Sequence, residues 1–253
     1  MDTFTGGNST IHTPEKSPYG VVTMAVGVYV LHYRASSFLP ADNLTWVAGP
    51  PLPISLQCVA RMSDSSFLVV GGENRRSVRQ YNTGDNVATA TRFWGWEPES
   101  TWPSLETGRI SPACLIINGQ MVVAGGWASP SIETINLATK AVTRVKDMKQ
   151  PRIFFQLAAF GEEGYMRLLA VAGESELTKL ASVEWLEEES GIWHEAAGEL
   201  AIARSHVGAV AVTQEMLNCT DKCDTCNGSG LVKGSMNTDF CDIKDIKKIL
   251  RKF

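Results

Sequence analysis

The sequence predicts an all-β protein that folds as a β-propeller of about four blades. Three apolar segments, each ended by glycine, are typical of buried strands that run into tight turns: Ser66–Gly72, Gly119–Gly126 and Arg167–Gly173. Each is followed by a serine and a branched aliphatic residue, and these serines, Ser77, Ser131 and Ser182, are 54 and 51 residues apart. A repeat of about 50 residues with several short strands is typical of a propeller, in which each blade is a small four-stranded sheet.

The chain divides into three parts. Residues 1–20 are polar and rich in glycine and proline, so we expect an irregular tail. Residues 21–216 contain the repeats and form the predicted propeller. Residues 217–253 hold four cysteines and end in Asp242–Phe253, whose apolar residues fall on one stripe and predict a basic amphipathic helix.

Within the propeller, each full repeat supplies four strands. The first repeat has an inner strand near Gln57–Arg61, a second strand that ends at Gly71-Gly72 and a third strand that ends at Tyr81. Its outer strand contains Trp94 or Trp96. The second repeat begins at Arg109 and has its outer strand near Thr143–Val145. The third repeat runs from Pro151 to Trp193. Val21–Trp46 and Arg204–Val212 are two further half-repeats.

These residues resemble the kelch repeat, with an inner strand that opens near arginine, a second strand that closes on Gly-Gly, and then an aromatic residue and a tryptophan. The resemblance covers about residues 21–216, although Val145 lies where the second repeat would have its tryptophan, and Ala172-Gly173 replaces a glycine pair. Glycine permits the positive φ of the turn. The aromatic residue and the tryptophan would fill the wedge between blades.

The number of blades follows from how the half-repeats are used. Val21–Trp46 could supply the later strands of a blade whose inner strand is Arg204–Val212, which would close a ring of four blades by sharing one between the two ends. Alternatively, the sequence is a fragment of a larger propeller.

A partner-binding face is expected where inner strands begin and second strands end, because an antiparallel blade brings these points to one edge. The residues expected there are Arg75, Arg76, Arg109, Trp127, Arg152 and Arg204. Such a face would suit a partner protein or peptide that carries carboxylates. The alternative for the recurring residues Arg109, Arg152 and Arg204 is that they pair with carboxylates or carbonyls inside the propeller.

The cysteines and the sequon asparagines bear on redox state, metal binding and compartment. Cys58 and Cys114 occupy comparable inner-strand positions and are expected to be small buried hydrophobic residues. Cys219, Cys223, Cys226 and Cys241 could form disulfides, bind zinc or remain free, and Cys223–Gly230 resembles a single zinc knuckle of the DnaJ type. Asn8, Asn43, Asn218 and Asn227 lie in glycosylation sequons, which suit an extracellular protein, whereas no basic leader segment precedes Val21–Leu31, which suits a cytoplasmic one.

Composition and motifs restrict the function. The net charge of -4 gives no reason to expect a nucleic acid as partner. The sequence has no apolar run of 18 residues, so we expect no transmembrane segment. The sequence has no nucleophile elbow, no H-E-x-x-H motif and no phosphate-binding loop, so we expect neither catalysis nor a cofactor. We predict a non-enzymatic protein-interaction module; the alternatives are a secreted glycosylated structural protein and a propeller oxidase or glycan-acting enzyme.

Overall fold

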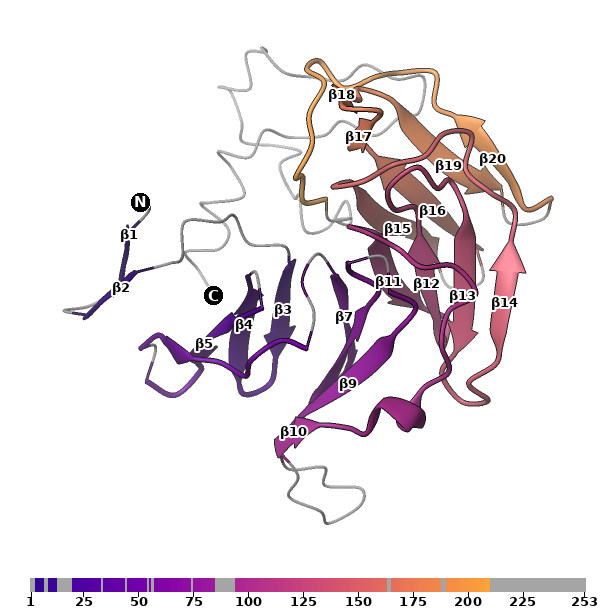
Figure 1. The fold of residues 1–253 in the computed structure, drawn as a ribbon. Coiled ribbons are helices and arrows are strands. Elements are labelled where there is room, and N and C mark those ends of the chain that lie inside the picture. The colour runs from indigo at the N-terminus through magenta and orange to yellow at the C-terminus, as the bar shows by residue number, and fades with distance from the viewer. Residues whose placement is uncertain are drawn as a thin grey trace.

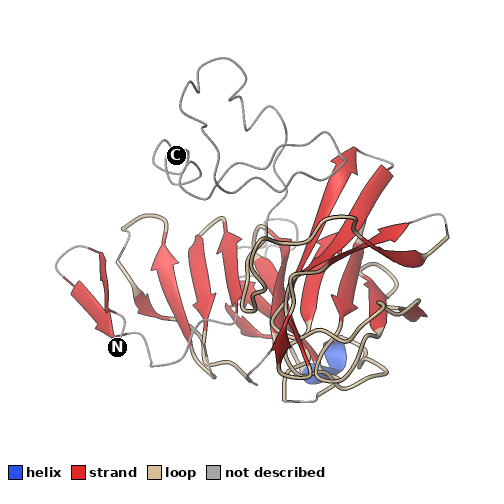
Figure 2. Cartoon of the chain, turned by 90° about the horizontal axis from the view of Figure 1, so that it is seen from above, coloured by secondary structure: helices blue, strands red, loops and turns tan. Residues whose placement is uncertain are grey.

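The computed structural model shows an all-β chain with four blades in a propeller arrangement (Figure 1). It describes residues 3–6, 9–12, 20–32, 34–43, 45–53, 55, 57–73, 75–84, 94–162, 165–187 and 190–209. Within these ranges the single helical element is the short 3₁₀ turn η1 (Glu99–Thr101), and strands make up the remaining regular structure (Figure 2). No helix in the described part of the chain is long and apolar enough to cross a membrane.

Each blade is a four-stranded antiparallel sheet. Blade 1 comprises β3 (Gly20–Met24), β4 (Gly27–Leu31), β5 (Ser36–Pro40) and β6 (Val47–Ala48). Blade 2 comprises β7 (Cys58–Ser63), β8 (Ser66–Val70), β9 (Val78–Thr83) and β10 (Trp94–Trp96).

Blades 3 and 4 follow in the same order along the chain. Blade 3 comprises β11 (Ala113–Ile117), β12 (Gln120–Ala124), β13 (Ile132–Asn136) and β14 (Val142–Val145). Blade 4 comprises β15 (Gln156–Glu162), β16 (Tyr165–Val171), β19 (Val183–Glu187) and β20 (Ile192–Glu195). A small hairpin of β17 (Glu174–Ser175) and β18 (Thr178–Lys179) projects between β16 and β19.

The inner strands β3, β7, β11 and β15 lie beside one another in this order, and the blades fan outward from them along an arc (Figure 1). Glycines end the second strands as the sequence predicts: φ is +70° at Gly71, +67° at Gly125 and +102° at Gly173. Ala172 takes the place of a first glycine and adopts φ +59° despite its Cβ. The expected blade boundaries of the three full repeats are therefore confirmed.

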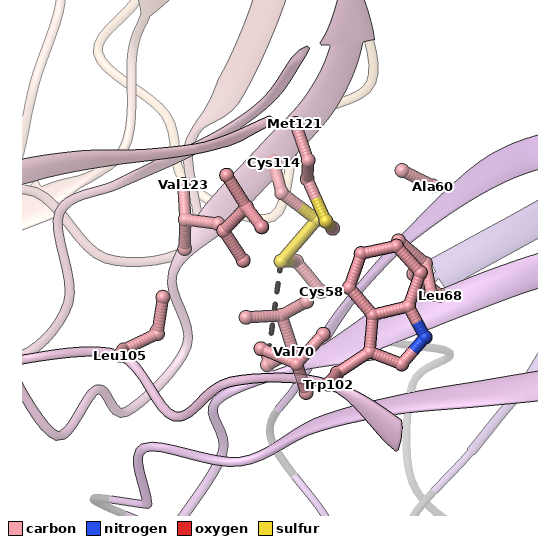
Figure 3. Packing of buried hydrophobic residues seen from close by; sticks show 11 residues of the cluster. Cys58, Ala60, Leu68, Val70, Trp102, Leu105, Cys114, Met121 and Val123 are labelled. Atoms are coloured by element: carbon pink, nitrogen blue, oxygen red, sulfur yellow. Dashed lines mark hydrogen bonds between the residues drawn. A yellow bond between two sulfur atoms is a disulfide. The ribbon is translucent and has the colours of Figure 1, made fainter. Parts of the chain in front are cut away.

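Alternation along the second strands of the two middle blades, β8 and β12, fills the wedges on both sides of each blade. On β8, Phe67 and Val69 point into the core between blades 1 and 2, whereas Leu68 and Val70 point into the core between blades 2 and 3. The latter core also contains Trp102, which lies on the segment that connects β10 to β11 (Figure 3). Each blade therefore depends on its neighbours to bury its apolar residues.

Aromatic residues occupy the wedges that the kelch-like pattern indicates. Tyr81 and Trp96 lie edge to face with ring centroids 5.1 Å apart, and both pack in the core between blades 1 and 2. Trp193 is buried between blades 3 and 4. The third and fourth strands thus contribute large side chains that fill the wedge where it widens toward the outside of the arc.

The prediction that the two ends of the chain share one blade is wrong. Blade 1 is complete in itself, because β3 pairs with β4 and supplies the inner strand that we had expected from Arg204–Val212. Residues 1–20 also differ from the expected irregular tail: β1 (Thr3–Gly6) pairs with β2 (Ser9–His12) in a separate hairpin. The expected terminal helix Asp242–Phe253 lies outside the described residues.

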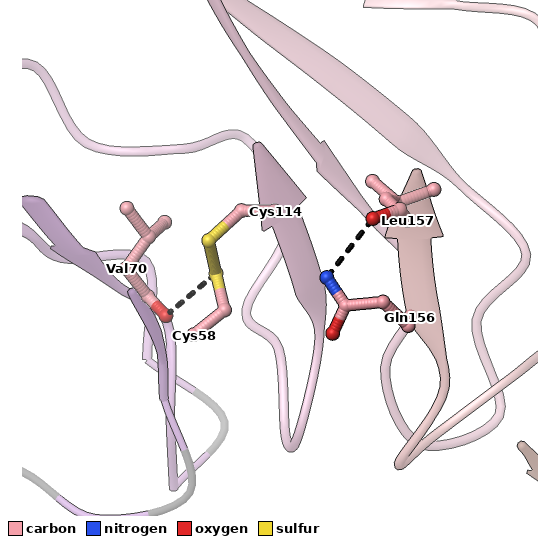
Figure 4. Close-up of a disulfide and its surroundings, with 5 residues drawn as sticks. All are labelled: Cys58, Val70, Cys114, Gln156 and Leu157. Carbon is pink, nitrogen blue, oxygen red and sulfur yellow. Dashed lines mark hydrogen bonds between the residues drawn. A yellow bond between two sulfur atoms is a disulfide. The ribbon is translucent and has the colours of Figure 1, made fainter. Parts of the chain in front are cut away.

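Cys58 and Cys114 are buried, as predicted, but they are joined by a disulfide rather than acting only as small hydrophobic residues (Figure 4). The bond links β7 of blade 2 to β11 of blade 3, with the two Cα atoms 5.8 Å apart. Cys58 pairs with Val70, the last residue of β8, whereas Cys114 pairs with Val123, one residue before the end of β12. This offset of one residue makes the two cysteines face each other in the core between blades 2 and 3. The disulfide closes a loop that spans a whole blade.

We expect the double variant Cys58→Ala/Cys114→Ala to unfold at lower urea concentration than the wild type. The sequence separation of 56 residues corresponds to a loop-closure contribution of about 4 kcal/mol. Urea unfolding with and without dithiothreitol measures this loss, and the reductant should shift the wild type but not the double variant. An identical shift in both proteins would show that another pair of cysteines causes the effect.

Candidate functional site

The candidate site is one edge of the propeller, which we call the loop edge. It is formed by the segments that follow second strands and those that precede inner strands. These are residues 73–77, 127–131 and 174–180 after the second strands, and 105–112, 148–155 and 200–206 before the inner strands. All six residues that were expected to contact a partner lie on these segments.

Backbone hydrogen bonds fix the segments of the loop edge to one another. The amide of the glycine after each second strand donates to the carbonyl of the arginine that opens the next repeat. The three bonds are Gly72 to Arg109 at 2.8 Å, Gly126 to Arg152 at 2.9 Å and Gly173 to Arg204 at 3.0 Å. The three arginines therefore have the same backbone position relative to the preceding blade.

The side chain of Arg109 is fully buried within blade 3. Its guanidinium donates to the carbonyls of Gly125 at 2.6 Å and Ser131 at 2.8 Å, and to the Oε1 of Glu133 at 2.7 Å. Glu133 also accepts hydrogen bonds from the backbone amides of Glu106 and Thr107. The ion pair thus anchors the segment that leads into blade 3.

Arg152 repeats this arrangement in blade 4. Its guanidinium donates to the carbonyls of Ala172 at 2.6 Å and Ser182 at 3.1 Å, and to the Oε1 of Glu184 at 2.8 Å. The other carboxylate oxygen of Glu184 accepts from the backbone amide of Lys149 at 2.6 Å. Charge-assisted hydrogen bonds of this kind compensate the desolvation of the buried ions.

Arg109 and Arg152 are consequently not partner-binding residues, and for them the alternative of internal pairing is correct. Arg109 is 1% exposed and Arg152 is 0% exposed. Burial lowers the pKa of Arg109, an effect that the hydrogen bond and charge of Glu133 oppose. The buried pairs of Arg109 and Arg152 instead hold the segments of the loop edge in place.

Arg204 differs from both, although its backbone position is equivalent. Its side chain is exposed, and the hydrogen bond it makes within the described chain is from Nε to the carbonyl of Ile202, at 3.2 Å. No described carboxylate lies within ion-pairing distance of it. Its positive charge is therefore available to solvent.

Blade 2 supplies a third arrangement at the loop edge. Glu73 pairs with Arg34 of blade 1 at 2.8 Å and lies 4.0 Å from Arg75. The hydrogen bond from the Ser55 hydroxyl is the main cause that lowers the pKa of Glu73, and the pairing with Arg34 lowers it further. Arg75 is thus exposed but partly neutralised, whereas Arg76 is exposed with no charged partner in the described chain.

Three exposed apolar side chains accompany these arginines. Trp127 follows Gly126 and is 52% exposed, Leu177 in the β17–β18 hairpin is 76% exposed, and Ile202 is 65% exposed. Sequence reasoning selected Trp127 and missed the other two. Leu177 could have been found as an apolar residue between Glu176 and Thr178 in a polar turn, whereas Ile202 is flanked by Ala201 and Ala203 and has no such signal.

The remaining expected sites are the four C-terminal cysteines and the sequon asparagines. Cys219, Cys223, Cys226 and Cys241 lie outside the described residues, as do Asn8, Asn218 and Asn227. Within the described ranges, no group of three or more His, Cys, Asp or Glu side chains is positioned to hold a metal ion. Asn43 is exposed in the turn after β5, where its side chain accepts a hydrogen bond from the Thr45 amide at 2.9 Å.

Comparison with known proteins adds no assignment. No protein-family model matches the chain, and no curated protein matches it.

We expect Arg109→Met to lower the free energy of unfolding by about 3–5 kcal/mol, because it leaves the Glu133 carboxylate buried without its cation. Arg61→Met is the matched control, since Arg61 pairs with Asp64 at the surface and such pairs contribute at most about 1 kcal/mol. Urea unfolding of both variants measures the difference. Similar small losses in the two variants would contradict a structural role for the buried pair.

Proposed function

We propose that this chain is a non-enzymatic protein-interaction module of the kelch type, which binds a partner protein or peptide at the loop edge. The kelch assignment rests on the glycine-ended second strands and on the aromatic residues in the blade wedges. A rigid scaffold that carries exposed loops is suited to recognition rather than to chemistry. The absence of a catalytic motif from the sequence supports the non-enzymatic part of the proposal.

The observation that carries the proposal is the combination of exposed apolar and cationic side chains on anchored loops. Trp127, Leu177 and Ile202 are exposed on the same edge as Arg76 and Arg204. Tryptophan and arginine are enriched among the residues that dominate binding energy at protein interfaces. Loops that are already held in place lose little conformational entropy on binding.

The charges at this edge suggest the chemistry of the partner. Arg76 and Arg204 have no described acidic partner, so an incoming carboxylate can pair with them without displacing an existing ion pair. Trp127 offers apolar surface for a neighbouring side chain of the partner. We therefore propose an acidic peptide or loop that carries an apolar residue next to its carboxylates.

Peptides selected on the intact wild-type chain from a random library should be enriched in Asp or Glu beside an apolar residue. A selected peptide should lose at least tenfold in affinity for Trp127→Ala/Arg204→Glu, which corresponds to about 1.4 kcal/mol or more. The matched control is Ile192→Ala/Arg61→Glu, where Ile192 is 44% exposed on β20 and Arg61 lies at the far end of β7. Equal affinity for both double variants, or no enrichment of acidic peptides, would refute the proposal.

A second candidate function is a secreted glycosylated structural protein, and two observations favour it. The disulfide between Cys58 and Cys114 suits an oxidising compartment. The sequon residue Asn43 is exposed in a turn, where a glycan can be accommodated.

If the chain passes through a secretory pathway, protein expressed with a heterologous leader in a eukaryotic host should carry a glycan at Asn43. We expect a mass decrease on enzymatic deglycosylation, and a smaller decrease for Asn43→Gln. Peptide mapping of the tryptic digest identifies the modified residue. An unmodified Asn43 in secreted protein would contradict this candidate.

A further inference from the structure

A hairpin insertion enlarges the loop edge at blade 4. Five residues separate Gly72 from β9 and Gly126 from β13, whereas nine residues separate Gly173 from β19. The additional residues belong to the hairpin of β17 and β18 (Figure 1). Because two repeats connect their second and third strands with five residues, the insertion is not needed to complete the blade.

Backbone hydrogen bonds fix the hairpin at the base of both its strands. The Glu174 amide donates to the Ile153 carbonyl at 2.9 Å, and the Ile153 amide donates back to the Glu174 carbonyl at 3.0 Å. At the other base, the Leu180 amide donates to the Gly173 carbonyl at 2.9 Å, and the Arg204 amide donates to the Leu180 carbonyl at 3.1 Å. The hairpin is therefore held at two points of the loop edge.

The turn at the tip of the hairpin has a backbone conformation that suits its residues poorly. Ser175 pairs with Thr178, so Glu176 and Leu177 are the two residues of the loop. Their φ angles are +48° and +66°. A two-residue hairpin loop with positive φ at both positions strongly favours Asn-Gly, Asp-Gly or Gly-Gly, because most other side chains meet a steric cost there. The chain thus has glutamate and leucine where more stable residues exist.

Packing within the fold does not compensate this strain at Leu177. The side chain is 76% exposed, the highest value among the exposed large hydrophobic residues of the described chain. Strained backbone positions cluster at sites where function uses them. An apolar side chain that is already held in place is buried by a partner with little loss of conformational entropy. The exposed leucine is therefore suited to burial by another molecule.

Glu176 gives the same tip a negative charge. It is exposed, and it forms no ion pair with another described residue. A partner that buries Leu177 brings its own surface within reach of this carboxylate, where a cation is favoured and an anion is repelled. The tip thus presents a leucine side chain next to a free carboxylate.

We propose that Leu177 anchors the loop edge to a folded partner protein by inserting into an apolar pocket that has a lysine or arginine at its rim. The inference rests on the proposed partner binding and specifies the partner, since a pocket requires a folded domain rather than an isolated peptide. Arg204 lies against the base of the hairpin. An acidic loop of the partner can therefore pair with Arg204 while a pocket beside that loop accepts Leu177.

Leu177→Asn tests whether the turn is strained. Asparagine adopts positive φ more readily than leucine, so the variant should unfold at a higher urea concentration than the wild type. Ile192→Asn is the matched control, because Ile192 is also an exposed aliphatic residue (44%) but lies on β20 without a positive φ, and this variant should not be stabilised. Equal unfolding midpoints of Leu177→Asn and the wild type would overturn the strained presentation of the leucine.

Folded probes test the anchor. Designed ankyrin-repeat domains are selected from a randomised library on the intact wild-type chain, without reference to the acidic peptides. Most selected domains should bind Leu177→Asn at least tenfold more weakly than the wild type, whereas Ile192→Asn should leave most affinities unchanged. Leu177→Met keeps an apolar side chain and should retain binding. Equal effects of the two asparagine variants across the panel, or no Lys or Arg enrichment at the randomised positions, would overturn the proposal.

The anchor and the proposed function fail in different ways. Weakened peptide binding to Trp127→Ala/Arg204→Glu, together with unchanged domain binding to Leu177→Asn, would refute the anchor and leave the proposed function intact. Selected peptides without acidic residues, together with a domain panel that depends on Leu177, would refute the acidic partner and support the anchor.

Discussion

The structure depends on the hydrogen bond between the end of one second strand and the start of the next repeat. Gly126 donates to the Arg152 carbonyl at 2.9 Å, Gly173 donates to the Arg204 carbonyl at 3.0 Å, and the same bond joins blades 2 and 3. At Gly125 the close approach requires glycine, because a Cβ there would lie 2.6 Å from the Arg152 oxygen. At the equivalent position of blade 4, Ala172 carries a Cβ and the same bond still forms. The contact brings the arginine that opens one repeat against the turn of the preceding one.

Much of the fold could be predicted, because strand alternation and glycine-ended turns are local signals. The boundaries of blades 2, 3 and 4 follow from them, down to the outer strand of Trp94–Trp96. Blade 1 could not be predicted correctly, because Leu31 is followed by His32 rather than by a glycine pair, so the repeat is hidden there. A β-hairpin of Val21–Leu31 is visible in the sequence, but its assignment to a separate blade requires knowing that Gly20–Met24 lies next to β7.

The candidate site was less predictable, because burial is a property of the whole repeat. Arg109 and Arg152 look like a recurring basic face in the sequence, and their partners Glu133 and Glu184 lie more than 20 residues further along. The two pairs occupy the same place on the third strands, one residue after the branched aliphatic residue that opens each. An alignment of the third strands of the repeats, beside that of the inner strands, would have revealed Glu133 and Glu184 at matching positions.

The contrast among the arginines explains why one edge combines rigidity with exposed charge. Arg109 and Arg152 are each neutralised by a glutamate from their own blade, at a cost in desolvation that the multiple hydrogen bonds offset. Arg204 is exposed and has no carboxylate partner among the described residues. The same backbone position therefore anchors a loop where a glutamate of the blade pairs with the arginine, as at Arg109 and Arg152, and carries an exposed cation at Arg204. A carboxylate from another molecule would give Arg204 the partner that the fold gives to its equivalents.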